Sequence, residues 1–278
     1  MTSVLVVSKG HDYDQTSFQT MLAELPDIEA TLVEQPAAQI ILQQPHIDAY
    51  DAVLFYDMSG IPGVGLTHDL ADDQGQPDPA YRQAIERLLE LGKGLVLLNH
   101  ATVSWPHWPL WRTITGSSFM LSAGLLNGQH TPGSGYRGGH GPYPNPTLKL
   151  QPAGNHRVLE GLDKGFTITD EIYLKTSDFE ANVVPLLRGE FDFVADNFTP
   201  PPLAPADEQA NWQHPPGSDL IVWANAAGNS PVVVSDVGDG PPAYENPDYR
   251  RLLGNALHWV ASAEARSWAT AQTGNNNG

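Results

Sequence analysis

Three short apolar runs in the first hundred residues constrain the fold most strongly. They are "SVLVV" at residues 3–7, "AVLFY" at residues 52–56 and "GLVLL" at residues 94–98, and none alternates between polar and apolar residues. Strands of a parallel sheet show such continuous runs, because the crossover helices cover both faces of the sheet. The runs therefore predict neighbouring parallel strands, each leading into a polar loop.

Helical patterns fill the intervals between these runs. Apolar residues recur at helical spacing after Asp14, which can cap a helix, and Pro26 stops that helix. A second helix is predicted between Pro79 and Gly92. Alternating strands and helices predict an α/β fold with a flavodoxin-like doubly wound sheet, mainly parallel, with helices on both faces. Later segments such as "FTITDEIYL" and "NVVPLLRG" add antiparallel edge strands.

The chain length suits one large domain, which we expect over residues 1–263. A proline-rich insertion at residues 196–218 is expected to loop out of this domain, as a lid or an oligomer contact. Residues 264–278 end in "TAQTGNNNG" and are predicted to be a disordered tail. The sequence leaves open whether the chain forms a homo-oligomer.

Composition excludes several classes of function. The 32 acidic residues outnumber the 14 lysines and arginines, so the net charge of -18 disfavours nucleic acid and anionic membranes as partners. There is no cysteine, which excludes thiolate nucleophiles and thiolate zinc sites. The N-terminal apolar run is too short for a signal peptide, so we expect a cytoplasmic location.

Polar residues follow the predicted strands where ligands of parallel sheets gather. His11 follows the first run, Asp57 the second and His100 the third. The turn "NHATVSW" is comparable to a nucleophile elbow, with His100 projecting at the start of a helix. Without a thiol partner, a histidine there suits proton transfer, metal ligation or hydrogen bonding to a ligand. The alternative is a histidine that caps the helix or is satisfied in the core.

Five further residues are candidates. Asp170 and Glu171 alternate along "ITDEIY", so one carboxylate can face the site as a general acid or base, or both are solvated at a strand end. Tyr173 shares a face with Glu171. His140 lies in a glycine-rich loop and is either exposed or close to a ligand. Trp105 begins an i+3 series of tryptophans predicted on one helix face, where core packing competes with stacking on a sugar.

No cofactor is predicted with certainty. The glycine-rich pieces "GIPGVG" and "GSGYRGG" do not lie between a strand and a helix, which argues against a dinucleotide site. The chain also lacks the HxH and HExxH spacings of metal sites. A divalent metal is left open, because the fold could bring His11, His100 or His140 together with Asp170 or Glu171.

Several segments together resemble the ThuA-like (trehalose-utilisation) family. They include "LLELGKGLVLLNHATVSWPHWPLWRTITG", "GFTITDEIYL" and "AYENPDYRRLLGNALHW", and they span most of the chain in the family's order. The resemblance implies a fold like that of class I glutamine amidotransferases, with His100 where those enzymes keep a cysteine, so glutaminase chemistry is excluded. The motif residues that it carries over are His100, Trp105, Asp170, Glu171, Tyr173, Tyr244 and Asn246.

The resemblance further implies carbohydrate catabolism, with a small oxidised (3-keto) glycoside or disaccharide as substrate of a hydrolase or lyase. His100 would act as general base or carbonyl-polarising group, and Glu171 or Asp170 as general acid. Substrate-binding roles are expected for His11, Asp57, Trp105, His140, Tyr173, Tyr244 and Asn246. The alternatives are a non-catalytic sugar-binding or assembly module and a metal-dependent hydrolase. One departure is Asp239, which stands where family members commonly have a histidine.

Overall fold

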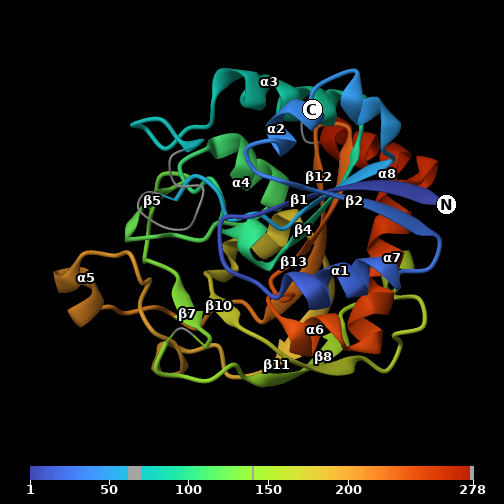
Figure 1. Cartoon of the computed structure of the whole chain (residues 1–278). Coiled ribbons are helices and arrows are strands. Elements are labelled where there is room, and N and C mark those ends of the chain that lie inside the picture. The colour runs from blue at the N-terminus through green and yellow to red at the C-terminus, as the bar shows by residue number, and fades with distance from the viewer. Residues whose placement is uncertain (62–69, 140, 276–278) are drawn as a thin grey trace.

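The computed structural model describes residues 1–61, 70–139 and 141–275, which form one large sheet covered by helices on both faces (Figure 1). The described sheet has nine strands in the order β2-β1-β3-β4-β13-β12-β11-β8-β9. Their bounds are β1 Thr2–Ser8, β2 Ile28–Glu34, β3 Ala52–Phe55, β4 Gly94–Leu98, β8 Thr147–Pro152, β9 Phe166–Thr169, β11 Val184–Glu190, β12 Leu220–Ala227 and β13 Ser230–Ser235.

Shorter elements surround this sheet. A hairpin joins β5 (Gly124–Leu126) to β6 (Gln129–Thr131), and a second antiparallel pair joins β7 (Gly135–Arg137) to β10 (Ile172–Leu174), which is distant in sequence. The α-helices are α1 Gln15–Ala23, α2 Ala38–Ile41, α3 Pro79–Leu91, α4 Pro109–Thr115, α5 Ala206–Ala210, α6 Pro241–Tyr244, α7 Pro247–Val260 and α8 Ala263–Asn275. The 3-10 helices are η1 His46–Ala49, η3 Asn99–Thr102, η4 Arg157–Leu159, η5 Ser177–Asn182 and η6 Ala195–Asn197.

The predicted flavodoxin-like sheet is confirmed. Strands β2, β1, β3, β4 and β13 pair in parallel, in the order expected of that fold. From β13 onward, β12, β11, β8 and β9 extend the sheet by antiparallel pairs. The predicted antiparallel part is therefore a block of four strands.

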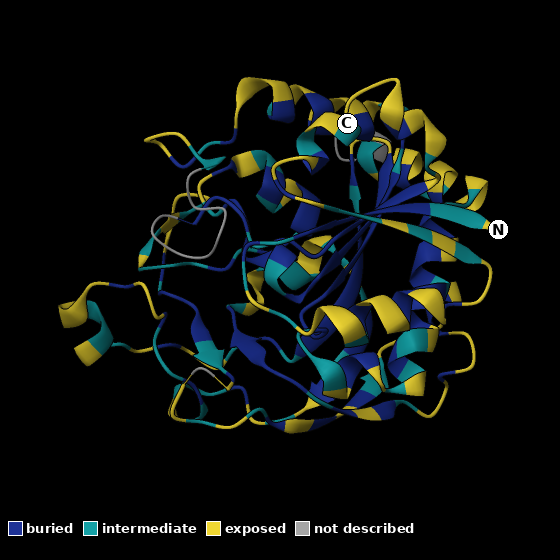
Figure 2. Cartoon of the chain, viewed as in Figure 1, coloured by how far each residue is buried: buried dark blue, intermediate teal, exposed yellow. Residues whose placement is uncertain are grey.

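Two hydrophobic cores lie on opposite faces of the sheet. In β1, Val4 and Val6 pack in the core beneath α1 and α7, whereas Leu5 and Val7 pack in the core beneath α2, α3 and α4. Successive strand residues point to opposite faces, so both kinds of position must be apolar. Figure 2 shows the result, a buried sheet whose covering helices expose only their outer sides.

The predicted helix ends are also found. Asp14 accepts a hydrogen bond from the backbone N–H of Ser17 and caps α1. Asp78 caps α3, and Gly92 ends it in the left-handed conformation with a φ of 68°. These caps fix where each helix leaves the sheet and where the chain enters β4.

The expected disordered tail is wrong for most of its length. Helix α8 covers Ala263–Asn275, and Ala265 and Ala269 are fully buried beside β12 and β13. Two alanines at i and i+4 provide a narrow apolar stripe, which suffices for packing although the surrounding sequence is polar. Residues 276–278 lie outside the described part of the chain.

The proline-rich insertion loops outward and carries α5, the orange helix that projects from the body in Figure 1. Hydrogen bonds near its two ends hold the insertion against the domain. Thr199 and Tyr136 exchange backbone hydrogen bonds of 2.8 and 2.9 Å, and the indole N–H of Trp212 donates to the carbonyl of Gly133 at 2.8 Å. None of the helices in the described ranges has the length and apolarity of a membrane span.

Candidate functional site

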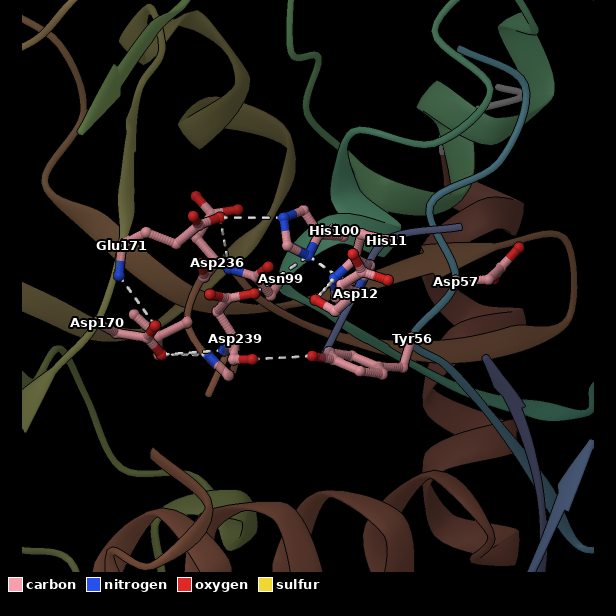
Figure 3. Close-up of polar contacts among 12 residues, drawn as sticks. His11, Asp12, Tyr56, Asp57, Asn99, His100, Asp170, Glu171, Asp236 and Asp239 are labelled. Atoms are coloured by element: carbon pink, nitrogen blue, oxygen red, sulfur yellow. Dashed lines mark hydrogen bonds and ion pairs between the residues drawn. The ribbon is translucent and has the colours of Figure 1, made fainter. Parts of the chain in front are cut away.

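A cluster of polar side chains lies at the carboxyl end of the parallel strands (Figure 3). His11 follows β1, His100 follows β4 and Asp239 follows β13. Glu171 comes from the short connection between β9 and β10. The carboxyl ends of parallel strands meet at one edge of the sheet, which is why residues so distant in sequence come together.

The turn that presents His100 is sharp. Asn99 directly follows β4 with a φ of 42°, and η3 begins at the same residue. The predicted sharp turn after the strand is therefore present, but it leads into the 3-10 helix η3 rather than into an α-helix. The expected helix with three tryptophans on one face is wrong, because α4 starts only at Pro109 and contains Trp111 alone.

Both ring nitrogens of His100 face protein groups. The Nε2 atom lies 3.3 Å from Oε1 of Glu171, and the Nδ1 atom lies 3.4 Å from Oδ1 of Asp239. The same Nδ1 is 3.0 Å from Nε2 of His11. With its side chain 12% exposed, His100 sits between two carboxylates and a second imidazole at the edge of solvent.

The carboxylate of Glu171 accepts hydrogen bonds from three side chains besides its contact with His100. Its Oε1 accepts hydrogen bonds from the hydroxyl of Tyr173 at 2.6 Å and from the amide of Asn99 at 3.3 Å. Its Oε2 accepts from the hydroxyl of Tyr136 at 2.9 Å. Burial and the neighbouring Glu171 raise the pKa of Tyr173 well above its usual range, so this hydroxyl remains a donor. The position of Glu171 is thus fixed from several sides.

His11 is held by its neighbour in sequence. Its Nδ1 lies 3.0 Å from the carbonyl oxygen of Asp12, an acceptor that only an N–H can face. Burial, followed by the charge on His100, lowers the pKa of His11 to about 3. At neutral pH the ring is therefore neutral, and its unprotonated Nε2 points at His100.

Asp239 was marked in the sequence only as a departure from the family pattern, yet it contacts His100. Its carbonyl oxygen accepts hydrogen bonds from the hydroxyls of Tyr56 at 3.0 Å and Tyr244 at 2.6 Å. Burial and the charge on Glu171 raise the pKa of the Asp239 carboxyl to about 7. The signal that could have identified it is its place in the loop that leaves β13, four residues after the strand ends at Ser235.

Asp170 has a structural position rather than a place in the cavity. Its Oδ2 accepts from the backbone N–H groups of Gly238 at 2.6 Å and Asp239 at 3.2 Å. Its Oδ1 accepts from the N–H of Glu171 at 2.9 Å. Burial raises its pKa well above the usual range, while the N–H of Gly238 lowers it. Asp170 therefore fixes Asp239 and Glu171, and the expectation that it serves as general acid is withdrawn.

The cluster opens into a cavity of about 710 Å³. His11, His100 and Glu171 lie at its polar end, and the aromatic rings of Phe119 and Tyr173 line its wall. Part of the lining comes from the proline-rich insertion, through Thr199, Pro200, Pro202, Leu203 and Gln209. A smaller hollow of about 470 Å³ beside α4 contains none of the candidate residues.

Several predicted binding residues lie outside this cavity. Asp57 is fully buried, points away from the cluster and accepts hydrogen bonds from Gln35 at 3.0 Å and Ser59 at 2.6 Å (Figure 3). Trp105 is also fully buried, and its ring packs against those of Tyr81 and Trp108 at centroid distances of 5.6 and 6.4 Å. Core packing explains both positions, so neither is kept as a binding residue.

Two C-terminal candidates support the site only indirectly. Tyr244 is buried behind Asp239, to whose carbonyl it donates. Asn246 caps α7 by accepting from the N–H groups of Asp248 and Tyr249. His140 lies outside the described residues.

The buried Asp57 gives a testable pH dependence. Burial raises its pKa to about 6, above the value of about 3.9 in an unfolded chain. The folded state therefore holds this proton more tightly, and its stability falls as the pH rises from about 4 to about 6. Asparagine accepts the same two hydrogen bonds without a charge. The free energy of unfolding of Asp57→Asn, relative to that of wild type, should therefore rise by on the order of 2 to 3 kcal/mol as the pH goes from about 4 to about 7. Urea unfolding at both pH values measures this, and an equal difference at both would contradict it.

Comparison with known proteins identifies relatives over nearly the whole chain. The ThuA family model, described as trehalose utilisation, matches residues 3–260. A ThuA-like protein from Bacteroides uniformis is 18% identical with a TM-score of 0.62, covering 94% of this chain and 92% of its own. One from Parabacteroides merdae is 14% identical with a TM-score of 0.62, covering 94% and 90%.

A cytoplasmic protein of Salmonella typhimurium is 11% identical with a TM-score of 0.52, covering 94% of this chain and 99% of its own. Identities this low support the shared fold, not a shared activity. A search of curated protein sequences finds no significant match.

Proposed function

Because the chain belongs to the ThuA family, we propose that it is an enzyme that cleaves a small oxidised glycoside, a 3-keto disaccharide, by acid and base chemistry at Glu171 and His100. One observation carries the proposal. A histidine and a glutamate lie in contact, 3.3 Å apart, where a cavity of disaccharide size reaches the carboxyl edge of the sheet. The family description of trehalose utilisation supports a disaccharide as substrate.

The cavity suits one sugar ring better than a long polymer. The rings of Phe119, Tyr136 and Tyr173 can pack on the apolar face of a pyranose, and residues of the proline-rich insertion also line the cavity. At about 710 Å³ the cavity lies within the usual range for small-molecule sites, about 300 to 1,000 Å³. A disaccharide fits this volume.

A 3-keto glycoside can be cleaved without the paired carboxylates of ordinary glycosidases. The C2–H bond lies next to the ketone and is therefore acidic, and Glu171 takes this proton to form an enolate. The C1–O bond then breaks, a C1=C2 double bond forms, and the departing glycosidic oxygen receives the proton from Glu171. Addition of water across C1=C2 completes hydrolysis, and omission of that addition makes the enzyme a lyase.

His100 has a different part in this scheme. Its Nε2 is turned to Glu171 and its Nδ1 to His11 and Asp239, so it does not take the substrate proton itself. It orients Glu171, and a cation held at His100 would stabilise the enolate oxygen. The polarising role expected of His100 is therefore kept, and the base is assigned to Glu171.

The experiment that tests this function is a substrate screen. Wild-type protein is incubated with 3-keto-trehalose and other 3-keto disaccharides, and with the parent disaccharides as controls, and the products are separated by mass spectrometry. Monosaccharide or unsaturated products are expected only from the 3-keto compounds. Saturable binding without any product would instead favour the sugar-binding alternative.

A further inference from the structure

Three metal-ligand side chains converge beside the cavity, and two of them, His11 and His100, line it. His11, His100 and Asp239 each offer one donor atom, and these atoms lie within 4.8 Å of one another. The residues come from the ends of β1, β4 and β13, whose pairing in the sheet fixes their separation. Such a set resembles the three-ligand sites that leave one coordination position for water or substrate.

The contacts around the two imidazoles favour a cation between them. The Nδ1 of His11 faces a carbonyl and must carry a proton. The Nε2 of His100 faces the carboxylate of Glu171 at 3.3 Å and must also carry one. If both rings are neutral, the lone pair of His11 Nε2 meets that of His100 Nδ1 at 3.0 Å, beside the carboxylate of Asp239. A metal cation bound between the two nitrogens, or a proton on one of them, removes this conflict.

The distances fit a metal. Ligand atoms at about 2.0 Å from a tetrahedral ion are separated by about 3.3 Å. The separation of His11 Nε2 and His100 Nδ1 is 3.0 Å, and that of His100 Nδ1 and Asp239 Oδ1 is 3.4 Å. The third separation can close by rotation of Asp239, whose side chain is 22% exposed.

The contact between His100 and Glu171 matches the second shell of a metal site. A ligating histidine commonly donates its other N–H to a carboxylate, which fixes the tautomer and orients the ring. Here Glu171 accepts that N–H, and Tyr173 and Tyr136 hold Glu171 in turn. In addition, a divalent ion balances the two carboxylates that flank His100, whereas a single proton balances one.

We propose that His11 through Nε2, His100 through Nδ1 and Asp239 through its carboxylate bind one divalent transition-metal ion, with Zn²⁺ as the representative of this class. The inference rests on the same site as the proposed function and names the cation held there. When bound, the ion would act as a Lewis acid toward the substrate carbonyl. Imidazole and carboxylate ligands together favour zinc and its first-row neighbours over magnesium or calcium.

The test measures binding of the metal alone. Full-length protein is freed of metal with a chelator, dialysed and titrated with ZnCl₂ by calorimetry. One ion per chain is expected. Loss of a second-shell partner typically costs about 10- to 100-fold in metal affinity, so loss of a ligand in His11→Ala or Asp239→Asn should raise Kd by at least about 100-fold. His46→Ala, which removes an exposed histidine outside the cluster, should leave Kd unchanged.

A second readout does not depend on the variants. Co²⁺ added to metal-free wild type should give visible absorption bands that Zn²⁺ then abolishes. The proposal is overturned if zinc does not bind, or if folded His11→Ala binds it as tightly as wild type. Zinc binding without turnover of any 3-keto disaccharide would refute the proposed function alone. Turnover of a 3-keto disaccharide by protein that binds no zinc in the titration would refute the metal site alone.

Discussion

Replacement of Glu171 by glutamine is expected to lower kcat on a 3-keto disaccharide by about 10²- to 10⁴-fold, the usual contribution of a general acid or base. Glutamine keeps an oxygen that can accept from Tyr173 and Asn99, and its amide can donate to the hydroxyl of Tyr136. The variant should therefore fold normally but lack the group that takes the C2 proton.

The comparison requires a matched variant. Glu86→Gln makes the same chemical change at an exposed position on α3, and its kcat should equal that of wild type. Steady-state kinetics and thermal unfolding are measured for all three proteins. A kcat for Glu171→Gln close to that of wild type would exclude Glu171 as the proton-transfer group.

The second large effect concerns stability. Lys175 and Asp236 form an ion pair of 2.6 Å, with side chains only 4% and 2% exposed. Burial lowers the pKa of Lys175 and raises that of Asp236, and each partner opposes the shift of the other. Lys175→Met would leave Asp236 buried without its counter-charge, so unfolding free energy should fall by about 3 to 5 kcal/mol near neutral pH.

The sign of the pH effect and a double variant check this interpretation. Without Lys175, Asp236 must be protonated in the folded state, so the loss should grow as the pH rises above about 4. Lys175→Met combined with Asp236→Asn should recover most of the lost stability, because no charge is then left unpaired. Urea unfolding measures all three, and a loss below about 1 kcal/mol in the single variant would contradict the prediction.

The parallel half of the fold could be predicted because its strands are buried on both faces. Strand β2 is not predicted by the sequence, because it is not buried on both faces. It lies at the edge of the sheet, and its residues alternate between partly buried and exposed, so it has no continuous apolar run. Helix α8 was missed because a stripe of alanines is a weak apolar signal in a polar sequence.

Most of the predicted site residues lie within three residues of the end of a strand. His11 and His100 meet that rule and do come together. Asp57 meets it as well, but its side chain turns into a buried network, a choice that depends on Gln35 and Ser59. Sequence position gives the end of a strand, and packing decides which way the side chain points.

Other members of the site carry no local signal. Tyr136 reaches Glu171 from β7, whose pairing with β10 is a long-range contact. Trp105 looked like a stacking residue beside the elbow, but a φ of 49° turns its ring into the core. Neither outcome can be read from spacing, because both depend on segments that meet only in the folded chain.

Hydrogen exchange at C2 of the substrate tests the central claim most directly. A 3-keto disaccharide is incubated in D₂O with wild type or with His100→Ala, and deuterium at C2 is followed by NMR in recovered substrate and product. Wild type is expected to introduce deuterium at C2 whenever it forms a saturated product, and folded His100→Ala is expected to introduce it at least about 10²-fold more slowly. Cleavage by wild type to a saturated monosaccharide without deuterium at C2, or equal exchange by the two proteins, would contradict proton abstraction at the Glu171 and His100 site.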